Sequence, residues 1–294
     1  ERYHRNKALY YINPEKTILY ADSLEWCGRI ISESGVKYHP RHYKSLLAMP
    51  PPTDVANLAH FVHAANWMRS AISNFAQLFQ PMYDKLTVAR ELTGSTATSN
   101  RGHVPLTSCN WTEADNVAFR QCQKAIANQI EAAYHDPEAE LFVFCDACDT
   151  GYGLFISQVL RFDPDKPLSR QKHEPLAYHS GIFTGKQLGW SIIEKEAFAL
   201  HEAVRKFRHI IQRPKGFRLM TDHRNLTFIL DPAQLKMRKS TTERLQRIAA
   251  ELSSFNYTIH HIDGVSNMWA DIASRWGHKT PVTVIAAHTR SKVR

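Results

Sequence analysis

The chain has 294 residues, of which 43% are hydrophobic and 22% are charged. This composition is typical of a folded globular protein and excludes a disordered, collagen-like or disulfide-framework chain. The formal net charge is +9, which favours a polyanionic partner such as nucleic acid, and no apolar run approaches the ~18 residues of a membrane-spanning helix, so we expect no membrane partner.

The cysteines and the first residues bear on the cellular compartment. There are five cysteines, an odd number, which suits an intracellular, reducing environment better than a secreted disulfide scaffold. Cys145 and Cys148 form a CxxC pair, but a zinc site would need a second pair and the sequence has none, so we expect ordinary thiols. The opening residues show no apolar secretion signal, and we expect a protein that is not secreted.

The first half of the chain predicts short strands followed by helices. We expect strands at 16–20 and 26–31. Pro40 suits the first turn of a helix that ends at Met49, and Thr53 is the expected N-cap of the next helix. Apolar spacing predicts further helices, and the Ser- and Thr-rich stretch 92–107 predicts a loop. The expected helices after the first cover 55–68, 74–86 and 111–132.

The second half alternates between strands and helices. The expected strands are 141–145, 151–159, 175–179, 217–221 and 257–262. The expected helices are 188–211, 224–230, 241–255 and 267–276, and Ser240 to Glu243 form a capping box for the third of these. This order predicts an α/β fold with one mixed five-stranded sheet and helices on its faces.

The long helix expected at 188–211 carries three glutamates. Its apolar side chains recur at spacings of three and four and form the face that packs on the sheet: Ile193, Ala197, Leu200, Val204 and Phe207. At about 100° per residue, Glu196 lies at the edge of this face, Glu194 farther round and Glu202 on the far side. We therefore expect Glu196 to be the glutamate nearest the sheet.

Three aspartates join Glu196 as candidate site residues. Asp146 follows the first strand of the sheet and Asp222 follows the fourth, and Asp271 opens the last expected helix. Ligands gather beyond the carboxyl ends of parallel strands, and converging carboxylates repel one another unless cations lie between them. Oxygen-only ligation selects Mg²⁺ or Mn²⁺, and two such ions suit attack of water on a phosphodiester. Each aspartate alone could instead be a turn or cap residue.

The net positive charge of the chain arises in its second half, because the basic and acidic residues of the first half balance. The stretch from Arg205 to Arg247 is its most basic part, and beside a carboxylate cluster it predicts phosphate contacts. A solvated basic surface is the alternative. The side chains expected to contact nucleic acid are Arg205, Arg208, Arg224, Arg244 and Arg247.

Several motifs in this half resemble the RNase H domain of gypsy-type LTR-retrotransposon Pol polyproteins. They occur in that family's order and spacing: Phe144-Cys-Asp146-Ala-Cys-Asp-Thr-Gly151-Tyr-Gly153, Leu176-Ala-Tyr178-His-Ser180, Glu194-Lys-Glu196-Ala, Thr221-Asp222-His223-Arg-Asn225-Leu226, and His261-Ile-Asp-Gly264-Val-Ser-Asn267-Met-Trp-Ala270-Asp271. The resemblance implies an RNase H-like fold and cleavage of the RNA strand of an RNA:DNA hybrid, as part of reverse transcription in an intracellular retroelement particle, cytoplasmic or nuclear.

The resemblance also implies roles for single residues. Asp146 would bridge two Mg²⁺ (or Mn²⁺) ions, Glu196 and Asp222 would hold one of them, and Asp271 would hold the ion that activates water. His223 and Asn267 are accessory candidates beside these acids, although a packed surface position is the alternative for His223. Either His260 or His261 could aid product release.

Upstream, the chain resembles the end of a reverse-transcriptase palm and the thumb that follows it. The implied domains are a palm remnant (1–36), a thumb-like helical region (37–105), a connecting helix (106–138), the RNase H-like domain (139–277) and a basic tail (278–294). Tyr20-Ala-Asp22 lacks the second aspartate of a polymerase motif, so we expect no polymerase activity from this chain alone. The implied partners are an RNA:DNA hybrid and the rest of the Pol polyprotein, namely palm and fingers, and integrase.

Two other functions are compatible with parts of the sequence. A catalytically inactive nucleic-acid-binding remnant of a retroelement polyprotein would keep the same motifs, and it would bind hybrid without cleaving it. An ATPase of the sugar-kinase or actin type could use residues 149–153 around phosphates, but the sequence offers no second phosphate-binding loop.

Overall fold

The computed structural model describes residues 15, 17–94, 104–232 and 243–263. A small antiparallel sheet comes first, with strands β1 (Ser23–Trp26), β2 (Arg29–Ser32) and β3 (Gly35–Tyr38). Residues 17–20 form no strand, and the strand expected at 26–31 is interrupted by a turn. Cys27 and Gly28 have positive φ angles of 47° and 74°, which is the backbone of a two-residue hairpin turn. Apolar pattern alone missed this turn because cysteine rarely adopts such a conformation.

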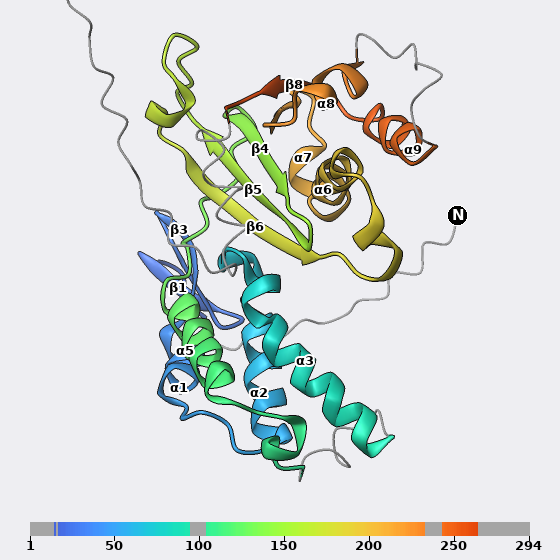
Figure 1. Cartoon of the computed structure of the whole chain (residues 1–294). Helices are drawn as coiled ribbons and strands as arrows, with labels where there is room; N and C mark the ends of the chain where they lie inside the picture. The colour runs from blue at the N-terminus through green and yellow to red at the C-terminus, as the bar shows by residue number, and fades with distance from the viewer. Residues whose placement is uncertain (1–14, 16, 95–103, 233–242, 264–294) are drawn as a thin grey trace, which may run out of the picture.

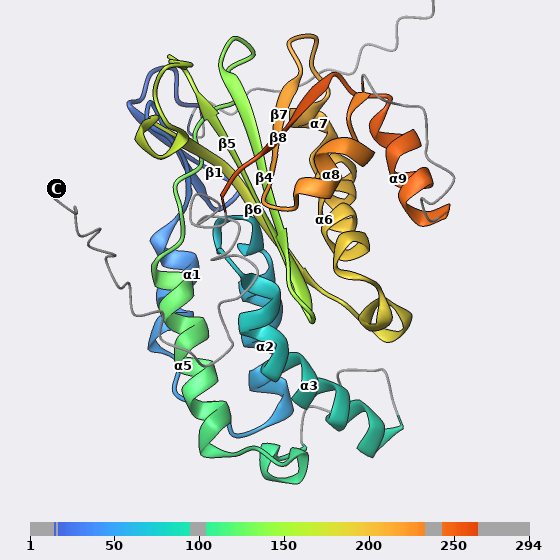
Figure 2. The same cartoon turned by 45° about the horizontal axis from the view of Figure 1, so that its top comes forward.

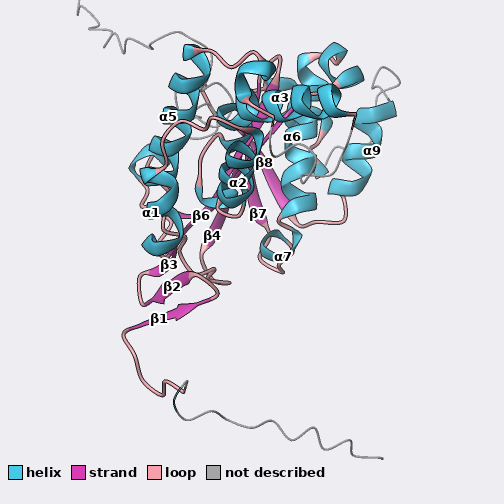
Figure 3. Ribbon diagram, turned by 90° about the horizontal axis from the view of Figure 1, so that it is seen from below, coloured by secondary structure: helices cyan, strands magenta, loops and turns pink. Residues whose placement is uncertain are grey.

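Four α-helices form a bundle beside this sheet: α1 (Pro40–Ala48), α2 (Val55–Asn66), α3 (Phe75–Thr93) and α5 (Glu113–Ala127) (Figure 1). Two short 3₁₀ segments, η2 (Arg69–Ala71) and η3 (Leu106–Cys109), lie between them in the chain. The apolar faces share one core, in which Phe61 contacts Phe79 and Phe119. Viewed from below, the small sheet lies at one end of the molecule, with β3 next to the helices (Figure 3), and Tyr38 of β3 packs into the helical core.

Two helix boundaries differ from those expected. The N-cap of α2 is Asp54 rather than Thr53, because Asp54 Oδ1 accepts a hydrogen bond from the amide of Asn57 at 2.8 Å. The helix expected to reach residue 132 ends at Ala127, because the following residues pair with other segments: Ala132 and Val36 exchange backbone hydrogen bonds. Long-range pairing of this kind leaves no local signal in the sequence.

The second half contains the expected mixed five-stranded sheet. Its strands are β4 (Glu140–Ala147), β5 (Gly151–Val159), β6 (Glu174–Ile182), β7 (Phe217–Thr221) and β8 (Tyr257–His261), in the spatial order β6-β5-β4-β7-β8. β4, β5 and β6 are antiparallel, whereas β4, β7 and β8 are parallel. The α/β fold class is therefore confirmed. The carboxyl ends of β4 and β7 lie at the same edge of the sheet.

Helices α6 (Ile192–Lys206) and α9 (Glu243–Leu252) pack on one face of this sheet (Figure 2). The single helix expected at 188–211 is three segments: the 3₁₀ helix η5 (Gly185–Gly189), α6 and the short α7 (Arg208–Ile211). A further helix, α8 (Arg224–Ile229), follows β7, and the 3₁₀ helix η4 (Leu168–Arg170) precedes β6. The expected capping box at Ser240 and the helix at 267–276 lie outside the described residues.

Glu202 corrects one expectation about α6. On the helical wheel it lies on the far side from the apolar stripe, yet the structure leaves it only 4% exposed. Its carboxylate accepts a hydrogen bond from Tyr152 on β5 and pairs with Arg205. The helical-wheel argument assumed one packed face, whereas α6 is also covered along its flank.

The helical bundle and the large sheet meet at β6. Ser180 on β6 is buried, and its Oγ accepts a hydrogen bond from the amide of Ala76 in the first turn of α3 at 2.9 Å. Arg69 donates to the Ser180 carbonyl, and Gln77 Nε2 lies 3.4 Å from the carbonyl of Gly181. A serine from the sheet thus supplies the side-chain cap of α3.

Candidate metal centre

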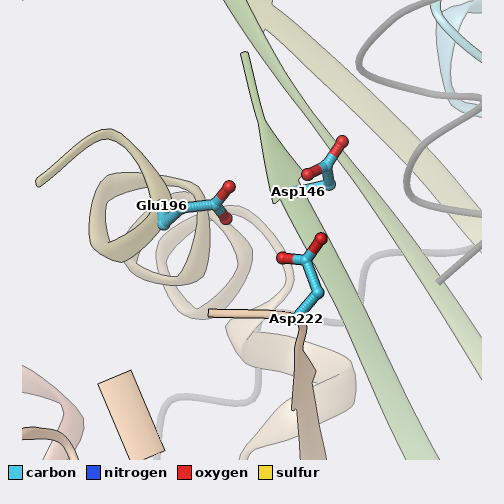
Figure 4. A group of neighbouring side chains, drawn as sticks. All are labelled: Asp146, Glu196 and Asp222. Atoms are coloured by element: carbon cyan, nitrogen blue, oxygen red, sulfur yellow. The ribbon is translucent and has the colours of Figure 1, made fainter. Parts of the chain in front are cut away.

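Three of the four expected carboxylates come together at the shared edge of β4 and β7. Asp146 is the penultimate residue of β4, Asp222 directly follows β7, and Glu196 lies in the second turn of α6. One carboxylate oxygen from each lies within 4.8 Å of the others (Figure 4). Asp146 and Glu196 are 1% and 4% exposed, and Asp222 is half-buried. Because β4 and β7 are parallel neighbours, their carboxyl ends place the two aspartates side by side.

The Glu196 carboxylate is oriented by the strand opposite. Its Oε1 accepts a hydrogen bond from the amide of Ala147, the residue after Asp146, at 3.0 Å. Glu194 points elsewhere: it caps the amide of Ser191 and accepts a hydrogen bond from Arg244 Nη1 at 2.5 Å. The geometry therefore separates the two glutamates in the way that the helical wheel indicated.

The donor set suits a hard divalent cation. Three carboxylates so close in a buried setting repel one another, and a cation between them removes that cost. Oxygen ligands favour Mg²⁺, Mn²⁺ or Ca²⁺ over zinc. Burial and the carboxylates of Glu196 and Asp146 raise the pKa of the neighbouring Cys145 well above its usual value, so this thiol stays protonated and is a poor metal ligand.

The other expected site residues occupy varied positions. Asp271 and Asn267 lie outside the described residues. His223 is partly buried after Asp222, and its amide donates to Thr221 Oγ1. His260 lies within hydrogen-bond distance of Thr258 Oγ1, and His261 Nε2 lies 3.1 Å from the carbonyl oxygen of Asp222. His261 thus contacts the backbone of a candidate ligand.

The expected nucleic-acid contacts are spread over several helices. Arg205 pairs with Glu202, and Arg208 Nε donates a hydrogen bond to Gln212 Oε1. Nine residues of helix separate Arg205 from Glu196, or about 14 Å. Arg244 lies over the Trp190 ring at 4.1 Å while it pairs with Glu194. Arg224 begins α8 and Arg247 lies on α9. Their roles toward nucleic acid stay predictions.

Sequence reasoning gave no role to Lys195, between the two glutamates of the Glu194-Lys-Glu196 motif. Its side chain is 3% exposed and contacts the turn that follows Asp146. The helical wheel gave no signal for it, because Lys195 lies on the side away from the apolar stripe, next to Glu202.

Comparison with known proteins agrees with this architecture. The sequence profile of the RNase H-like domain found in reverse transcriptase matches residues 136–255. The Pol polyprotein of transposon 412 from Drosophila melanogaster is 26% identical over 265 residues, which are 90% of this chain and 19% of that protein. The transposon Tf2-3 polyprotein of Schizosaccharomyces pombe is 24% identical over 265 residues, covering 90% of this chain and 18% of the polyprotein. The chain thus spans about a fifth of the length of these relatives.

Solved structures share the fold over most of the chain. The foamy viral protease-reverse transcriptase in complex with RNA/DNA hybrid superimposes with a TM-score of 0.62 at 17% identity, covering 95% of this chain and 33% of that chain. The same enzyme in complex with dsDNA gives a TM-score of 0.60 at 17% identity, over 85% and 47% of the two chains. The described helices also include none that is long and apolar enough to cross a membrane. Residues 136–255 therefore match the RNase H-like domain found in reverse transcriptase, and 90% of the chain is similar to a segment of retrotransposon Pol polyproteins.

Proposed function

We propose that this chain is a metal-dependent endoribonuclease that cuts the RNA strand of RNA:DNA hybrids. The observation that carries the proposal is the meeting of Asp146, Glu196 and Asp222 at the edge of the RNase H-like sheet. Phosphodiester hydrolysis needs a site that neutralises charge on the phosphate and activates a water. An oxygen-only cluster of this kind supplies such a site once cations are bound.

Each carboxylate has a proposed task. Asp146 would contact both of two Mg²⁺ or Mn²⁺ ions, Glu196 and Asp222 would hold one, and Asp271 would complete the set. When bound, two such ions activate the attacking water and stabilise the leaving oxygen. The surrounding backbone orients these carboxylates. The amide of Ala147 donates a hydrogen bond to Glu196, and the parallel pairing of β4 with β7 holds the two aspartates in register.

The proposed substrate follows from charge and from the relatives. The basic second half of the chain favours a phosphate backbone, and a structure with this fold is a complex with RNA/DNA hybrid. Contacts to phosphates and 2′-hydroxyls rather than base edges would give little sequence preference. We further propose that the chain works beside the palm, fingers and integrase of a Pol polyprotein, inside an intracellular retroelement particle.

A labelled hybrid incubated with and without Mg²⁺ tests the proposal. We expect cleavage of the RNA strand only with the metal, and loss of at least 100-fold in rate for Asp146→Asn. The matched control is Asp149→Asn, because the Asp149 carboxylate lies in the next turn and is 98% exposed. Cleavage by Asp146→Asn at the wild-type rate would contradict the metal site. Hybrid binding without metal-dependent cleavage by the wild type would instead identify an inactive binding remnant.

A further inference from the structure

Lys195 is a buried cation on α6, directly before Glu196. Its side chain is 3% exposed, and Nζ donates to the carbonyl oxygen of Asp149 at 2.9 Å. The ammonium also lies 5.6 Å from the centre of the Phe183 ring. Asp149 Oδ1 is 3.8 Å away, but that carboxylate is 98% exposed, so solvent screens the pair. The backbone carbonyl is therefore the main partner of Lys195.

Burying a lysine at this position lowers the stability of the fold unless its ammonium group makes compensating interactions. Removing an ammonium from water costs several kcal/mol, and only hydrogen bonds and nearby negative charge offset it. An apolar side chain would pack on this face of α6 at lower cost. The position of Lys195 therefore indicates a task at the turn that it contacts.

That turn begins at Cys148, two residues after Asp146, and joins β4 to β5. The amide of Cys148 donates to the Gly151 carbonyl, and the amide of Phe183 donates to the Thr150 carbonyl, each at 2.8 Å. Two adjacent residues of α6 contact the same turn: Glu196 accepts from the amide of Ala147, and Lys195 donates to the carbonyl of Asp149. Helix and turn are thus joined at two points, on either side of Cys148.

We propose that Lys195 is a positioning residue for the metal centre. By holding the β4–β5 turn against α6, it keeps Asp146 and Glu196 at ligating distance before any ion binds. Groups that orient ligands in this way typically change metal affinity 10- to 100-fold when they are removed. The inference rests on the proposed function, since it assumes that the three carboxylates bind a divalent cation.

Binding of Mn²⁺ to the purified chain without nucleic acid tests the inference, with free Mn²⁺ followed by electron paramagnetic resonance. We expect Lys195→Met to weaken Mn²⁺ binding about tenfold while thermal unfolding stays cooperative. The matched control is Lys206→Met, an exposed lysine on the same helix, which should bind as the wild type does. Wild-type affinity in Lys195→Met would overturn the inference, whereas a wild type that binds no Mn²⁺ would overturn the proposed function.

Hydrogen exchange of the wild type gives a second test that needs no variant. If Lys195 holds the turn in advance, the amides of Cys148 and Phe183 should be protected in metal-free protein and change little when Mn²⁺ is added. Fast exchange without metal and protection only with metal would contradict the inference, because the ion would then be what orders the turn. This measurement stays decisive if Lys195→Met does not fold.

Discussion

At the residue scale, neighbouring acids have different tasks because their surroundings differ. Glu196 faces the end of β4 and contacts the amide of Ala147, whereas Glu194 caps α6 and pairs with Arg244. A change at Glu196 should therefore lower the rate of hybrid cleavage. A change at Glu194 should act on the attachment of α9 to α6.

Glu196→Gln and Glu194→Gln should separate these tasks. We expect Glu196→Gln to lose at least 100-fold in hybrid cleavage with a nearly unchanged free energy of unfolding. Glu194→Gln should keep its cleavage rate but lose about 1–2 kcal/mol of stability, because Arg244 loses the negative partner of its ion pair. Cleavage assays and urea unfolding on both variants check this. Equal losses of cleavage would show that the assignment of the two glutamates is wrong.

A partly buried histidine, His179 on β6, should make the stability of the fold depend on pH. Burial, helped by the nearby Arg69 and Lys206 cations, lowers the pKa of His179 to about 4. In the unfolded chain histidine titrates near 6.5, so below that pH the unfolded state takes up a proton that the folded state does not. Proton uptake by the unfolded state therefore lowers the free energy of unfolding as the pH falls from about 6.5 toward 4, and this loss is absent above pH ~6.5.

Urea unfolding at pH 7 and pH 5 measures this effect. Between these values the wild type should lose about 2 kcal/mol through His179, and His179→Asn should lose correspondingly less. His60→Asn is the control, since His60 is exposed on α2. If the pH dependence of His179→Asn equals that of the wild type, the partly buried histidine does not contribute.

At the element scale, β5 and β6 approach closely where glycine is required. A Cβ added to Gly181 would lie 2.4 Å from the Tyr152 ring, and one added to Gly151 would lie 2.6 Å from Gln77 Nε2. The Tyr152 ring occupies the space beside Gly181, and Tyr152 in turn contacts Glu202 of α6. The glycine at position 181 therefore reflects the close packing of β5, β6 and α6.

Gly181→Ala should destabilise the protein by about 1–3 kcal/mol, because the Tyr152 ring must move and lose its contact with Glu202. The control is Gly189→Ala, where an added Cβ meets nothing within 4 Å. The free energy of unfolding in urea is the measurement. A loss at position 181 no larger than that at 189 would contradict the close approach.

At the scale of the whole molecule, the helical bundle and the RNase H-like sheet have separate cores, which are joined by polar contacts and by Ile130, an apolar residue that packs against both. Ser180 caps α3, Arg69 donates to the Ser180 carbonyl, and Gln77 reaches the β5–β6 edge. These contacts couple two units that could otherwise unfold independently.

Ser180→Ala combined with Gln77→Ala should weaken this coupling. We expect the calorimetric unfolding of the double variant to split or broaden, because the amide of Ala76 loses its cap and each core then melts closer to its own temperature. Ser253→Ala, an exposed serine at the end of α9, is the control and should keep the wild-type profile. A single sharp transition in the double variant would show that apolar contacts couple the two halves.

The sequence by itself determined the α/β class, the strands 151–159 and 217–221 to the residue, and Asp146, Glu196 and Asp222 as candidate ligands. The spacing of apolar residues and the order of strands can be read along the chain. The two aspartates can be read in the same way, because each stands at the end of a strand. Only the tertiary structure decided the burial of Glu202, the cap on α3 and the contact of Lys195 with the β4–β5 turn. These depend on residues distant in the chain, so no local pattern encodes them.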